Sequence, residues 1–532
     1  MRVCYNMRMK ELFDILIKNV SVIDGSGAPA FDASIGMADG KIKIFRDGQL
    51  PAAGRVIDGT GLTAVPGFID SHSHGDLMVT DRFSAASKLT QGFTSQIAGQ
   101  CGYSAFPCHA GEEALWKSFL TSVATHPSVP PKPAEDAASY APWHEWESAS
   151  GIPLTTYSLV GHGTLRLWAM GYDRRKPTAE ELQKMCDMLR QCMREGAKGL
   201  STGLVYAPCV YAEEEELVAL LNVVREENGV FTCHPYNESD ESEEALAQAI
   251  RLAGLAGVPL CESHFKSCGR QNWGKPHRML EQTRAARANG QRIMLDCYPY
   301  IAGATALNIS IPPRWFENGL TGLTEALADP VRRAAIREEM DRHEGYENFI
   351  VNCGGLQGVY VTSCPDFHDA EGMFVTDYAA KTGQDPFDAY CDILVKNGCH
   401  GLAVYFHMNE DDVAEILADP WCAVGTDGLL GLPAENPHPR TFGTTARAFD
   451  LVVRQKKLVS AEEMIRKMTS LPATFFGLDG KGFIRDGYDA DVVLLDLPAF
   501  RDRATWDNGT ARTEGIRRLF KAGKEIDLEE YR

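Results

Sequence analysis

The strongest constraint on the fold is a repeat, which begins near residue 68, of short apolar segments alternating with amphipathic segments of helical period. In one such unit, Thr178 and Glu181 form a capping box ahead of apolar residues that share a helical face, and a strand-like segment follows at 198–203. Successive strand–helix units form right-handed crossovers that place their strands parallel. The predicted fold class is α/β, with a TIM-like (β/α)8 barrel.

Two further units follow the same pattern. Strand-like segments at 229–233 and 258–261 enclose a helical pattern at 243–252, and a helical pattern at 279–288 leads to a strand-like segment at 292–297. Polar residues follow each of these apolar segments. Barrel enzymes keep their active sites at the carboxyl ends of the strands, so these polar residues are the first candidates for chemistry.

The two ends of the chain carry a different pattern, rich in β-branched residues and hairpin signals such as Asp39-Gly40. We expect both ends to build one small β-sandwich domain. A Pro-containing, charged stretch around 304–374 interrupts the repeat and predicts a lid-like insertion over the barrel. The predicted division is residues 10–67 for the N-terminal half of the sandwich, 68–478 for the catalytic barrel and 479–532 for the C-terminal half.

Composition excludes several classes of function. The formal net charge of −19 argues against binding to nucleic acid, which needs a basic surface. No apolar run is long enough for a signal peptide or a membrane span. The fifteen cysteines are scattered, odd in number and without a CxxC pair, which favours reduced thiols in the cytoplasm. A homo-oligomer is compatible with the sequence, which specifies no symmetry.

A pair of histidines ends the first predicted barrel strand. His72 and His74 stand two positions apart after the apolar segment 68–70, so strand geometry directs both imidazoles to the same side, where they can reach one metal. Two solvated loop histidines are the alternative for such a short motif.

Four more residues with metal-binding side chains follow other predicted strands, namely Cys101, His234, His264 and Asp427. Barrel closure would bring all of them to the same rim. Each residue alone has an ordinary structural alternative: a buried cysteine, a rim histidine or an Asp-Gly turn.

Together these six residues offer the nitrogen, sulfur and oxygen donors that zinc prefers. Zinc would lower the pKa of a bound water toward about 7 and polarise a carbonyl, which are the two requirements for hydrolysing an unactivated amide. Asp427 is then the predicted general base, which takes the proton of the water and later delivers it to the leaving nitrogen.

The same residues lie in a series of strings whose order resembles that of the N-acyl-D-amino-acid deacylases (D-aminoacylases) of the amidohydrolase superfamily. The resemblance covers nearly the whole chain. It implies zinc-dependent hydrolysis of N-acyl-D-amino acids to a carboxylate and a free D-amino acid. The strings are FIDSHSHGD, GQCGYS, VGHGTLR, GLSTGLVYAP, CHPYNE, ESHFK, DCYPYIAG, GTDG and HPRTFGT.

The resemblance also assigns roles to the metal-binding residues. A tightly held zinc falls to Cys101, His234 and His264. A second, weaker metal position falls to His72, His74 and Asp427, and Asp427 matches the catalytic acid/base of the family.

Substrate contacts are implied in the same way. Lys266 and Tyr298 match positions that hold the α-carboxylate of the substrate, and Tyr206 matches a residue near the scissile carbonyl. A cation beside a tyrosine hydroxyl suits a carboxylate, because charge-assisted hydrogen bonds are strong. The alternative for Lys266 is a solvated rim lysine. Arg440 and its neighbour His438 are further candidates for carboxylate or lid contacts, with a loop-anchoring arginine as the alternative.

Two departures from the family pattern put its usual substrate range in question. The string that normally reads TAGS ends here in Ala304, which loses a serine hydroxyl that Thr305 could replace. After His234 the chain has Pro235-Tyr236, where an arginine-bearing string is usual.

Two other functions compete with the deacylase. A cyclic amidase of the dihydropyrimidinase or hydantoinase type would bridge two metals with a carboxylated lysine, whereas this chain offers Cys101. A non-catalytic barrel scaffold would be expected to lose metal ligands, and all six candidates are present.

Overall fold

Parallel strands with helices on their outer faces make up the middle of the chain, which confirms the α/β class. The computed structural model describes residues 12–531 apart from 48, 49, 122, 125, 343 and 430–435. One parallel sheet has the order β6 (Phe68–Asp70), β7 (Phe93–Ala98) and β8 (Thr155–Ser158). The second has the order β18 (Cys422–Val424), β13 (Ile293–Cys297), β12 (Leu260–Glu262), β11 (Val230–His234), β10 (Gly199–Gly203) and β9 (Val160–Gly161).

The two parallel sheets meet at both of their ends. At one end, β9 begins two residues after β8 finishes. At the other, the Ser71 N–H after β6 donates to the Val424 carbonyl of β18 at 3.4 Å. The carboxyl ends of all these strands therefore lie on one side of the molecule.

The long helices between the strands, such as those at 179–195, 214–226 and 242–256, bury one apolar face. The predicted capping box is present, because the Thr178 hydroxyl accepts the Glu181 N–H at 3.2 Å and Glu181 returns a bond to the Thr178 N–H. The helix that this box begins is α6 (Ala179–Glu195). The other helices of this part are α1 (Arg82–Leu89), α2 (Glu113–Leu120), α3 (Pro133–Asp136), α4 (Tyr140–Ser148), α5 (His162–Met170), α7 (Glu214–Glu226), α8 (Ser242–Ala256), α9 (Lys275–Ala288), α15 (Glu410–Ala418), α16 (Arg440–Phe449), α17 (Ala461–Met468) and α18 (Ser470–Phe475).

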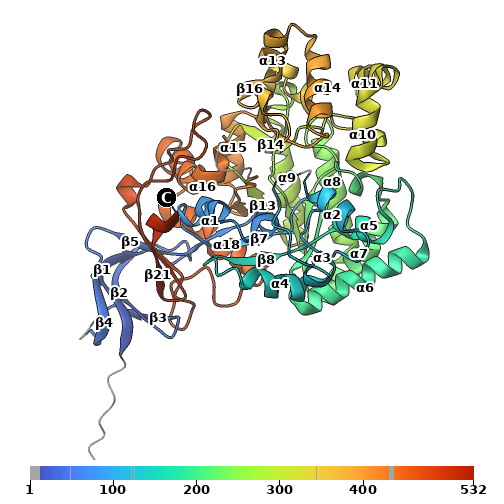
Figure 1. Ribbon diagram of the computed structural model, residues 1–532. Helices are drawn as coiled ribbons and strands as arrows, with labels where there is room; N and C mark the ends of the chain where they lie inside the picture. Colours follow the sequence, from blue (N-terminus) through green and yellow to red (C-terminus); the bar gives the residue numbers. More distant parts are fainter. Residues whose placement is uncertain are drawn as a thin grey trace, which may run out of the picture.

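Both ends of the chain contribute to a separate eight-stranded sheet, which lies to one side of the helices (Figure 1). The Asp39-Gly40 hairpin forms as predicted, with both residues at positive φ. Residues 10, 11 and 532, included in our domain division, lie outside the described residues. The sheet contains β1 (Phe13–Val22), β2 (Phe31–Ala38), β3 (Lys41–Phe45), β4 (Ala53–Asp58), β5 (Thr63–Pro66), β19 (Val492–Leu495), β20 (Ile516–Lys521) and β21 (Lys524–Ile526).

A third region interrupts the strand–helix repeat between β13 and β18. Its antiparallel sheet has the order β14 (Ala302–Ala306), β17 (Leu402–Phe406), β15 (Val359–Ser363) and β16 (Met373–Phe374). The helices at 319–328, 330–342, 375–382 and 386–396 gather at the top of Figure 1. The helices of this region are α10 (Gly319–Ala328), α11 (Pro330–Arg342), α12 (Phe349–Asn352), α13 (Val375–Thr382) and α14 (Pro386–Lys396).

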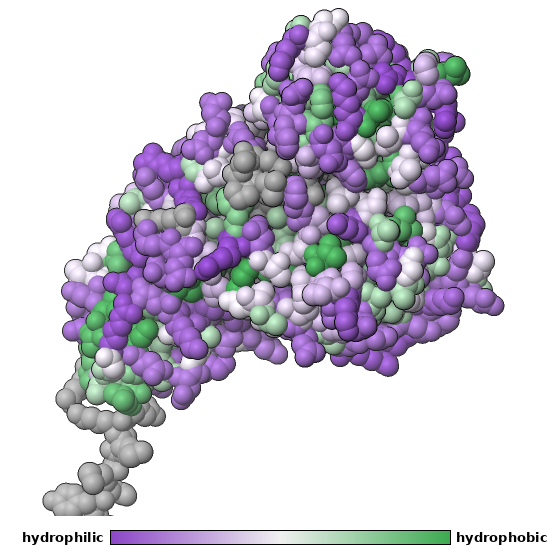
Figure 2. Space-filling view, in the orientation of Figure 1, coloured by the Kyte–Doolittle hydropathy of each residue, from purple (hydrophilic) through white to green (hydrophobic). Residues whose placement is uncertain are grey.

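The surface shown in Figure 2 is mainly hydrophilic, with apolar residues scattered singly or in small groups. Within the described ranges, none of the helices combines the length and apolar character needed to cross a membrane. No disulfide joins cysteines of the described part of the chain.

Candidate active site

The six predicted metal-binding residues meet in one buried cluster at the carboxyl ends of the parallel strands. Each follows its strand directly, or within a few residues, so the strand order fixes their relative positions. None is more than 8% exposed. The residues are His72 and His74 after β6, Cys101 after β7, His234 at the end of β11, His264 after β12 and Asp427 after β18.

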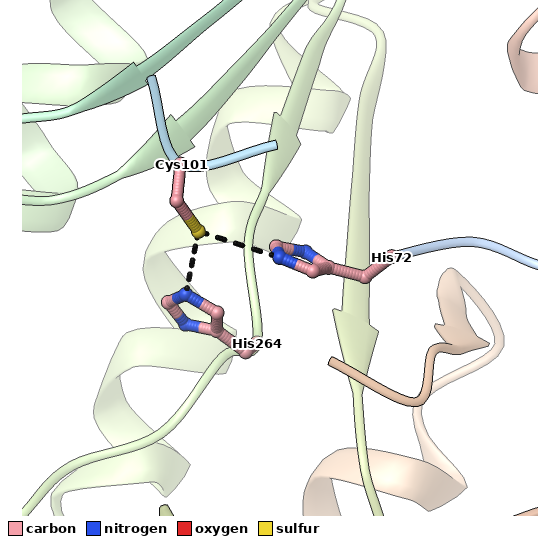
Figure 3. Close-up of side chains that lie close together, drawn as sticks. All are labelled: His72, Cys101 and His264. Atoms are coloured by element: carbon pink, nitrogen blue, oxygen red, sulfur yellow. Dashed lines mark hydrogen bonds between the residues drawn. The ribbon is translucent and has the colours of Figure 1, made fainter. Parts of the chain in front are cut away.

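Cys101 lies at the centre of the cluster. Its Sγ is 3.4 Å from His72 Nε2 and 3.3 Å from His264 Nε2 (Figure 3). The turn that carries the thiol requires glycine at position 99, where φ is +72° and a Cβ would lie 2.2 Å from the Leu159 carbonyl oxygen. Cys101 itself has a positive φ of 55°. A tight, strained turn thus directs the sulfur toward both imidazoles.

His72 and His74 point to the same side of β6, as the spacing predicts, and both face Asp427. Asp427 Oδ1 is 3.6 Å from His72 Nε2 and 3.3 Å from His74 Nε2. The other ring nitrogen of His72 is 3.1 Å from Asp296 at the end of β13. Metal-binding histidines commonly contact a carboxylate in this way, which fixes the ring orientation. Sequence reasoning missed Asp296, although it begins the DCYPYIAG string.

Glu238 is a second functional residue that the sequence analysis missed. Its carboxylate lies 3.0 Å from His264 Nδ1 and 3.6 Å from His234 Nε2. Lys266 Nζ donates to the same carboxylate at 2.5 Å. The signal for Glu238 was its position four residues after His234 in the CHPYNE string.

The ligand atoms of these residues fall into three overlapping groups, within each of which every pair is at most 4.8 Å apart. His72 and His264 each belong to two groups, so the groups form one continuous cluster. Cys101 groups with His72 and His264, whereas His234 groups with Glu238 and His264. The groups are His72 with Cys101 and His264, His72 with His74 and Asp427, and His234 with Glu238 and His264.

Burial and neighbouring charges set the protonation states in the cluster. Burial lowers the pKa of His234 and of His264 well below the usual range, which keeps both imidazoles neutral, the form that binds metals. Burial raises the pKa of the Cys101 thiol well above its usual range, and Asp427 raises it further. Burial also opposes ionisation of Asp427, but Arg440 and His74 outweigh it and hold that pKa well below its usual range.

Arg440 lines the pocket and also holds a backbone segment. Its Nη1 lies 2.9 Å from Asp427 Oδ2, and its guanidinium carbon lies 4.5 Å from the centroid of the Tyr298 ring. Its Nη2 donates to the Ala304 carbonyl at 2.9 Å. The His438 side chain contacts the backbone, because its Nδ1 accepts the Arg440 backbone N–H at 3.0 Å.

The remaining predicted substrate residues also lie in the pocket. Lys266 is buried and paired with Glu238, so the solvated rim lysine is not what the structure shows. The Tyr206 hydroxyl lies 3.0 Å from Thr305 Oγ1, and the Tyr206 ring contacts the ring of His234 with centroids 4.9 Å apart. Thr305 therefore does place a hydroxyl in the pocket near Ala304.

His407 is a third residue that the sequence did not indicate. It follows β17, a strand of the interrupting sheet, and so lies outside the strand–helix repeat that identified the other residues. It lines the same cavity as Cys101, Tyr298 and Arg440.

The chain matches one family model and several known proteins over most of its length. The model of the amidohydrolase family matches residues 55–304 and 380–527. N-acyl-D-glutamate deacylase of Alcaligenes xylosoxydans xylosoxydans is 33% identical, over 97% of this chain and 94% of the relative. D-aminoacylase of the same organism is 30% identical, over 97% of this chain and 95% of the relative.

Among solved structures, N-acyl-D-glutamate deacylase from Bordetella bronchiseptica, complexed with zinc and a phosphonate mimic of the tetrahedral intermediate, superimposes with a TM-score of 0.81. The two chains are 31% identical, and the match covers 97% of each. Dihydropyrimidinase from Brevibacillus agri shares 17% identity at a TM-score of 0.53, over 96% of this chain and 94% of that one, which shows a common fold alone.

Proposed function

This chain belongs to the N-acyl-D-amino-acid deacylase (D-aminoacylase) family of amidohydrolases, and we propose that it hydrolyses the amide bond of N-acyl-D-amino acids with the help of zinc. The products are a carboxylate and a free D-amino acid. The observation that carries the proposal is the position of the Cys101 sulfur, 3.3 to 3.4 Å from two buried imidazoles.

The donors present fit zinc. Both ring nitrogens of His234 are buried without a hydrogen-bond partner among the described residues, although buried polar atoms are rarely left so. Sulfur, imidazole and carboxylate donors within a few ångströms of one another are the set that zinc selects. We assign the tightly held zinc to Cys101, His234 and His264, and a second, weaker position to His72, His74 and Asp427. When bound, the metal supplies Lewis acidity that activates water and polarises the scissile carbonyl.

Asp427 is the proposed general base and acid. Its depressed pKa keeps the carboxylate ionised near neutral pH, ready to accept a proton from the attacking water. Arg440 holds one carboxylate oxygen, which leaves the other directed at His72 and His74. The same residue is placed to return the proton to the leaving nitrogen.

The cationic and hydroxyl groups beside the metal cluster orient the substrate. We assign the α-carboxylate to Tyr298 and Arg440, whose guanidinium lies over the tyrosine ring, and to Lys266. Tyr206, in contact with His234, is assigned to the neighbourhood of the scissile carbonyl.

We also propose the domain organisation that this chemistry requires. The two parallel sheets form one closed (β/α)8 barrel in residues 68–478, and residues 10–67 and 479–532 pair as the two halves of a β-sandwich. The region that follows β13 acts as a lid, since Gly303, Thr305 and His407 reach the pocket from its sheet.

A panel of substrates distinguishes the deacylase from a cyclic amidase. The zinc-loaded enzyme is expected to release amine from linear N-acetyl-D-amino acids and to leave hydantoin and dihydrouracil intact. Ring opening of either cyclic amide, without cleavage of the linear substrates, would overturn the proposal.

A further inference from the structure

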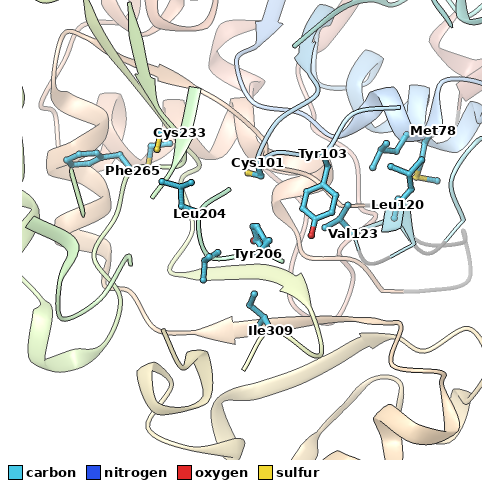
Figure 4. Packing of buried hydrophobic residues seen from close by; sticks show 14 of the residues in the cluster. Met78, Cys101, Tyr103, Leu120, Val123, Leu204, Tyr206, Cys233, Phe265 and Ile309 are labelled. Carbon is cyan, nitrogen blue, oxygen red and sulfur yellow. The ribbon is translucent and has the colours of Figure 1, made fainter. Parts of the chain in front are cut away.

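A second cavity of about 240 Å³ lies against the metal pocket and has no part in the chemistry proposed above. The metal pocket itself encloses only about 30 Å³, which is room for little more than a water-sized group. Tyr206 belongs to the walls of both cavities. Figure 4 shows Tyr206 between Cys101 on the metal side and Ile309 on the side of the second cavity.

Consecutive residues of one segment line first the metal pocket and then the second cavity. Gly303, Ala304 and Thr305 line the metal pocket, and Ala306, Asn308 and Ile309, which follow directly, line the second cavity. A Cβ at Gly303 would lie 3.3 Å from the Tyr298 hydroxyl, which places the carboxylate-binding end at Gly303.

Thr305 contacts Tyr206 at the opposite end of this short segment. Residues two apart in a strand are separated by about 6.5 Å, which exceeds the roughly 4 Å between the α-carboxylate carbon and the acyl carbonyl carbon and so reaches the first carbons of the acyl chain. A substrate anchored at Tyr298 therefore directs its acyl group past Tyr206 and into the second cavity.

The wall of this cavity disfavours anionic groups. None of its described lining residues is basic, whereas Asp240, Glu241 and Glu347 contribute acidic side chains. The apolar part of the wall includes Leu204, Val205, Ile309, Ile311, Phe316 and Leu320. An apolar cavity of about 150 Å³ is large enough to bind benzene, so this one has room for an aromatic ring or a chain of about six to eight carbons.

We propose, on the basis of the function proposed above, that this cavity binds the acyl group and that the preferred substrates are D-amino acids with an uncharged acyl chain of about six to eight carbons or an aromatic acyl group. Each buried methylene then raises kcat/KM roughly fourfold. Short or anionic acyl groups, such as acetyl and succinyl, are poorer substrates of the same site.

The test compares N-acetyl, N-butanoyl, N-octanoyl and N-succinyl derivatives of one D-amino acid. In the wild type, kcat/KM is expected to rise at least 50-fold from acetyl to octanoyl and to be lower for succinyl than for butanoyl. Ile309→Trp, which fills the cavity, is expected to reduce the octanoyl-to-acetyl ratio at least 10-fold. Val331→Trp, on the exposed face of α11, is the matched control and leaves the ratio unchanged.

A flat dependence on chain length in the wild type would overturn this inference while leaving the deacylase function intact. Failure to cleave any N-acyl-D-amino acid would instead overturn the function itself. If Ile309→Trp does not fold, Leu204→Phe serves in its place, and calorimetric titration with octanoate supplies a readout independent of turnover. Octanoate binding that is equal in wild type and variant contradicts the assignment.

A separate observation concerns His407, a buried imidazole with neither ring nitrogen hydrogen-bonded to any described residue. Its side chain lines the metal pocket, and a Cβ at Gly303 would lie 3.0 Å from His407 Nε2 and 3.3 Å from the Tyr298 hydroxyl. Gly303 thus leaves open a small space that both polar groups face. Burial and the nearby Lys266 lower the pKa of His407 to about 3, so the ring is neutral and carries one N–H donor.

We further infer that His407 donates a hydrogen bond to the α-carboxylate of the substrate, together with Tyr298. A buried donor without a partner costs free energy, and a substrate oxygen in this space would satisfy it. His407 thereby supplies a donor in the region where Ala304 has lost the serine hydroxyl of related chains.

His407→Ala is expected to raise KM for an N-acyl-D-amino acid about 10-fold or more, with kcat changed less than threefold and zinc content unchanged. His407→Gln, which retains an N–H donor, is expected to recover most of the loss. With the α-carboxamide analogue of the substrate, the effect of His407→Ala on kcat/KM should shrink to less than threefold. An unchanged KM in His407→Ala, or an equal effect of this variant on the carboxamide, would show that His407 does not bind the α-carboxylate.

Discussion

His72 and His264 each belong to two groups of candidate ligands, so they would couple the two proposed metal positions. His72 lies 3.4 Å from Cys101 and 3.6 Å from Asp427. A change at His72 therefore affects both positions, whereas a change at His74 is confined to the side of Asp427. Zinc bound by Cys101 also favours the thiolate that burial alone disfavours.

Replacement of Asp427 by Asn is expected to reduce kcat about 10²- to 10⁴-fold, because the amide cannot accept the proton of the attacking water. Zinc at Cys101, His234 and His264 should remain, as measured by metal analysis of the purified variant. Asp187→Asn, on the exposed face of α6, is the control and retains wild-type activity. Retained activity in Asp427→Asn would refute the role of Asp427 as the base.

Asp296 contacts two of the proposed ligands, His72 and His264. Its carboxylate lies 3.1 Å from His72 Nδ1 and accepts the His264 N–H at 2.6 Å. Asp296→Asn is expected to weaken metal binding or activity about 10- to 100-fold, the usual effect of removing the carboxylate behind a ligating histidine. Competition with a chromophoric chelator measures the change, and equal affinities in variant and wild type would contradict the role.

The candidate metal ligands at the strand ends could be predicted from the sequence. The residues that contact these ligands could not. Cys101, His234 and Asp427 could be found because the strand–helix repeat places them at a common rim. Asp296 and Glu238 could not be assigned, because a carboxylate at a strand end or in a loop gains its role only from the histidine it faces. His407 was inaccessible to this reasoning, since its strand belongs to the interrupting sheet.

At the scale of elements, the buried ion pair of Lys88 and Asp70 connects helix α1 to the ends of two strands. Lys88 Nζ donates to Asp70 at 2.6 Å and to the Thr426 hydroxyl at 2.7 Å. Asp70 ends β6, and Thr426 lies between β18 and Asp427. The pair thus sets the separation of the loops that carry the histidine pair and the proposed base.

Lys88→Met is expected to lower the free energy of unfolding by about 3–5 kcal/mol, because it leaves the Asp70 carboxylate buried without its cation. Urea denaturation followed by circular dichroism measures the loss. The control is Lys132→Met, which breaks the exposed pair with Glu135 and is expected to leave the free energy of unfolding nearly unchanged. A loss at Lys88 as small as that of the control would show that the pair does not fasten these elements.

Helices with a clear cap and apolar face, such as α6, could be predicted to within a residue or two. The strand pairing within residues 302–406 could not be predicted from the sequence. β14 pairs with β17, almost a hundred residues later in the chain, and periodicity within a short window carries no information about such a distant partner.

At the scale of the whole molecule, the chain is strongly acidic but has cationic side chains in the pocket where an anionic substrate would bind. The formal net charge is −19, yet Lys266 and Arg440 lie buried beside Tyr298. The acidic surface does not assist an anion to approach, so the pocket must supply the attraction locally.

A hydrogen bond to the Asp502 carboxyl group, whose pKa is raised, connects the C-terminal segment to Tyr300. The Tyr300 hydroxyl donates to Asp502 at 2.8 Å, and burial raises the pKa of Asp502 to about 6. The folded protein therefore holds this proton up to a higher pH than the unfolded chain, whose ordinary value is 3.8. Ionisation of Asp502 thus lowers stability progressively as the pH rises from about 4 to about 6.

Comparison of wild type with Asp502→Asn isolates this effect. The stability of the wild type relative to the variant is expected to fall by about 2 kcal/mol between pH 4 and pH 6 and to stay constant above about pH 7. Urea unfolding at several pH values measures the difference. A difference that is independent of pH would show that the carboxyl titrates normally in the folded protein.

Metal-dependent, stereoselective amide hydrolysis is tested most directly by amine release from N-acyl-D- and N-acyl-L-amino acids of the same structure, before and after removal of metal with a chelator. We expect release from the D enantiomer alone, loss of that activity with the chelator and its return on addition of zinc. Hydrolysis of the L enantiomer alone, or activity that survives complete removal of the metal, would contradict the account.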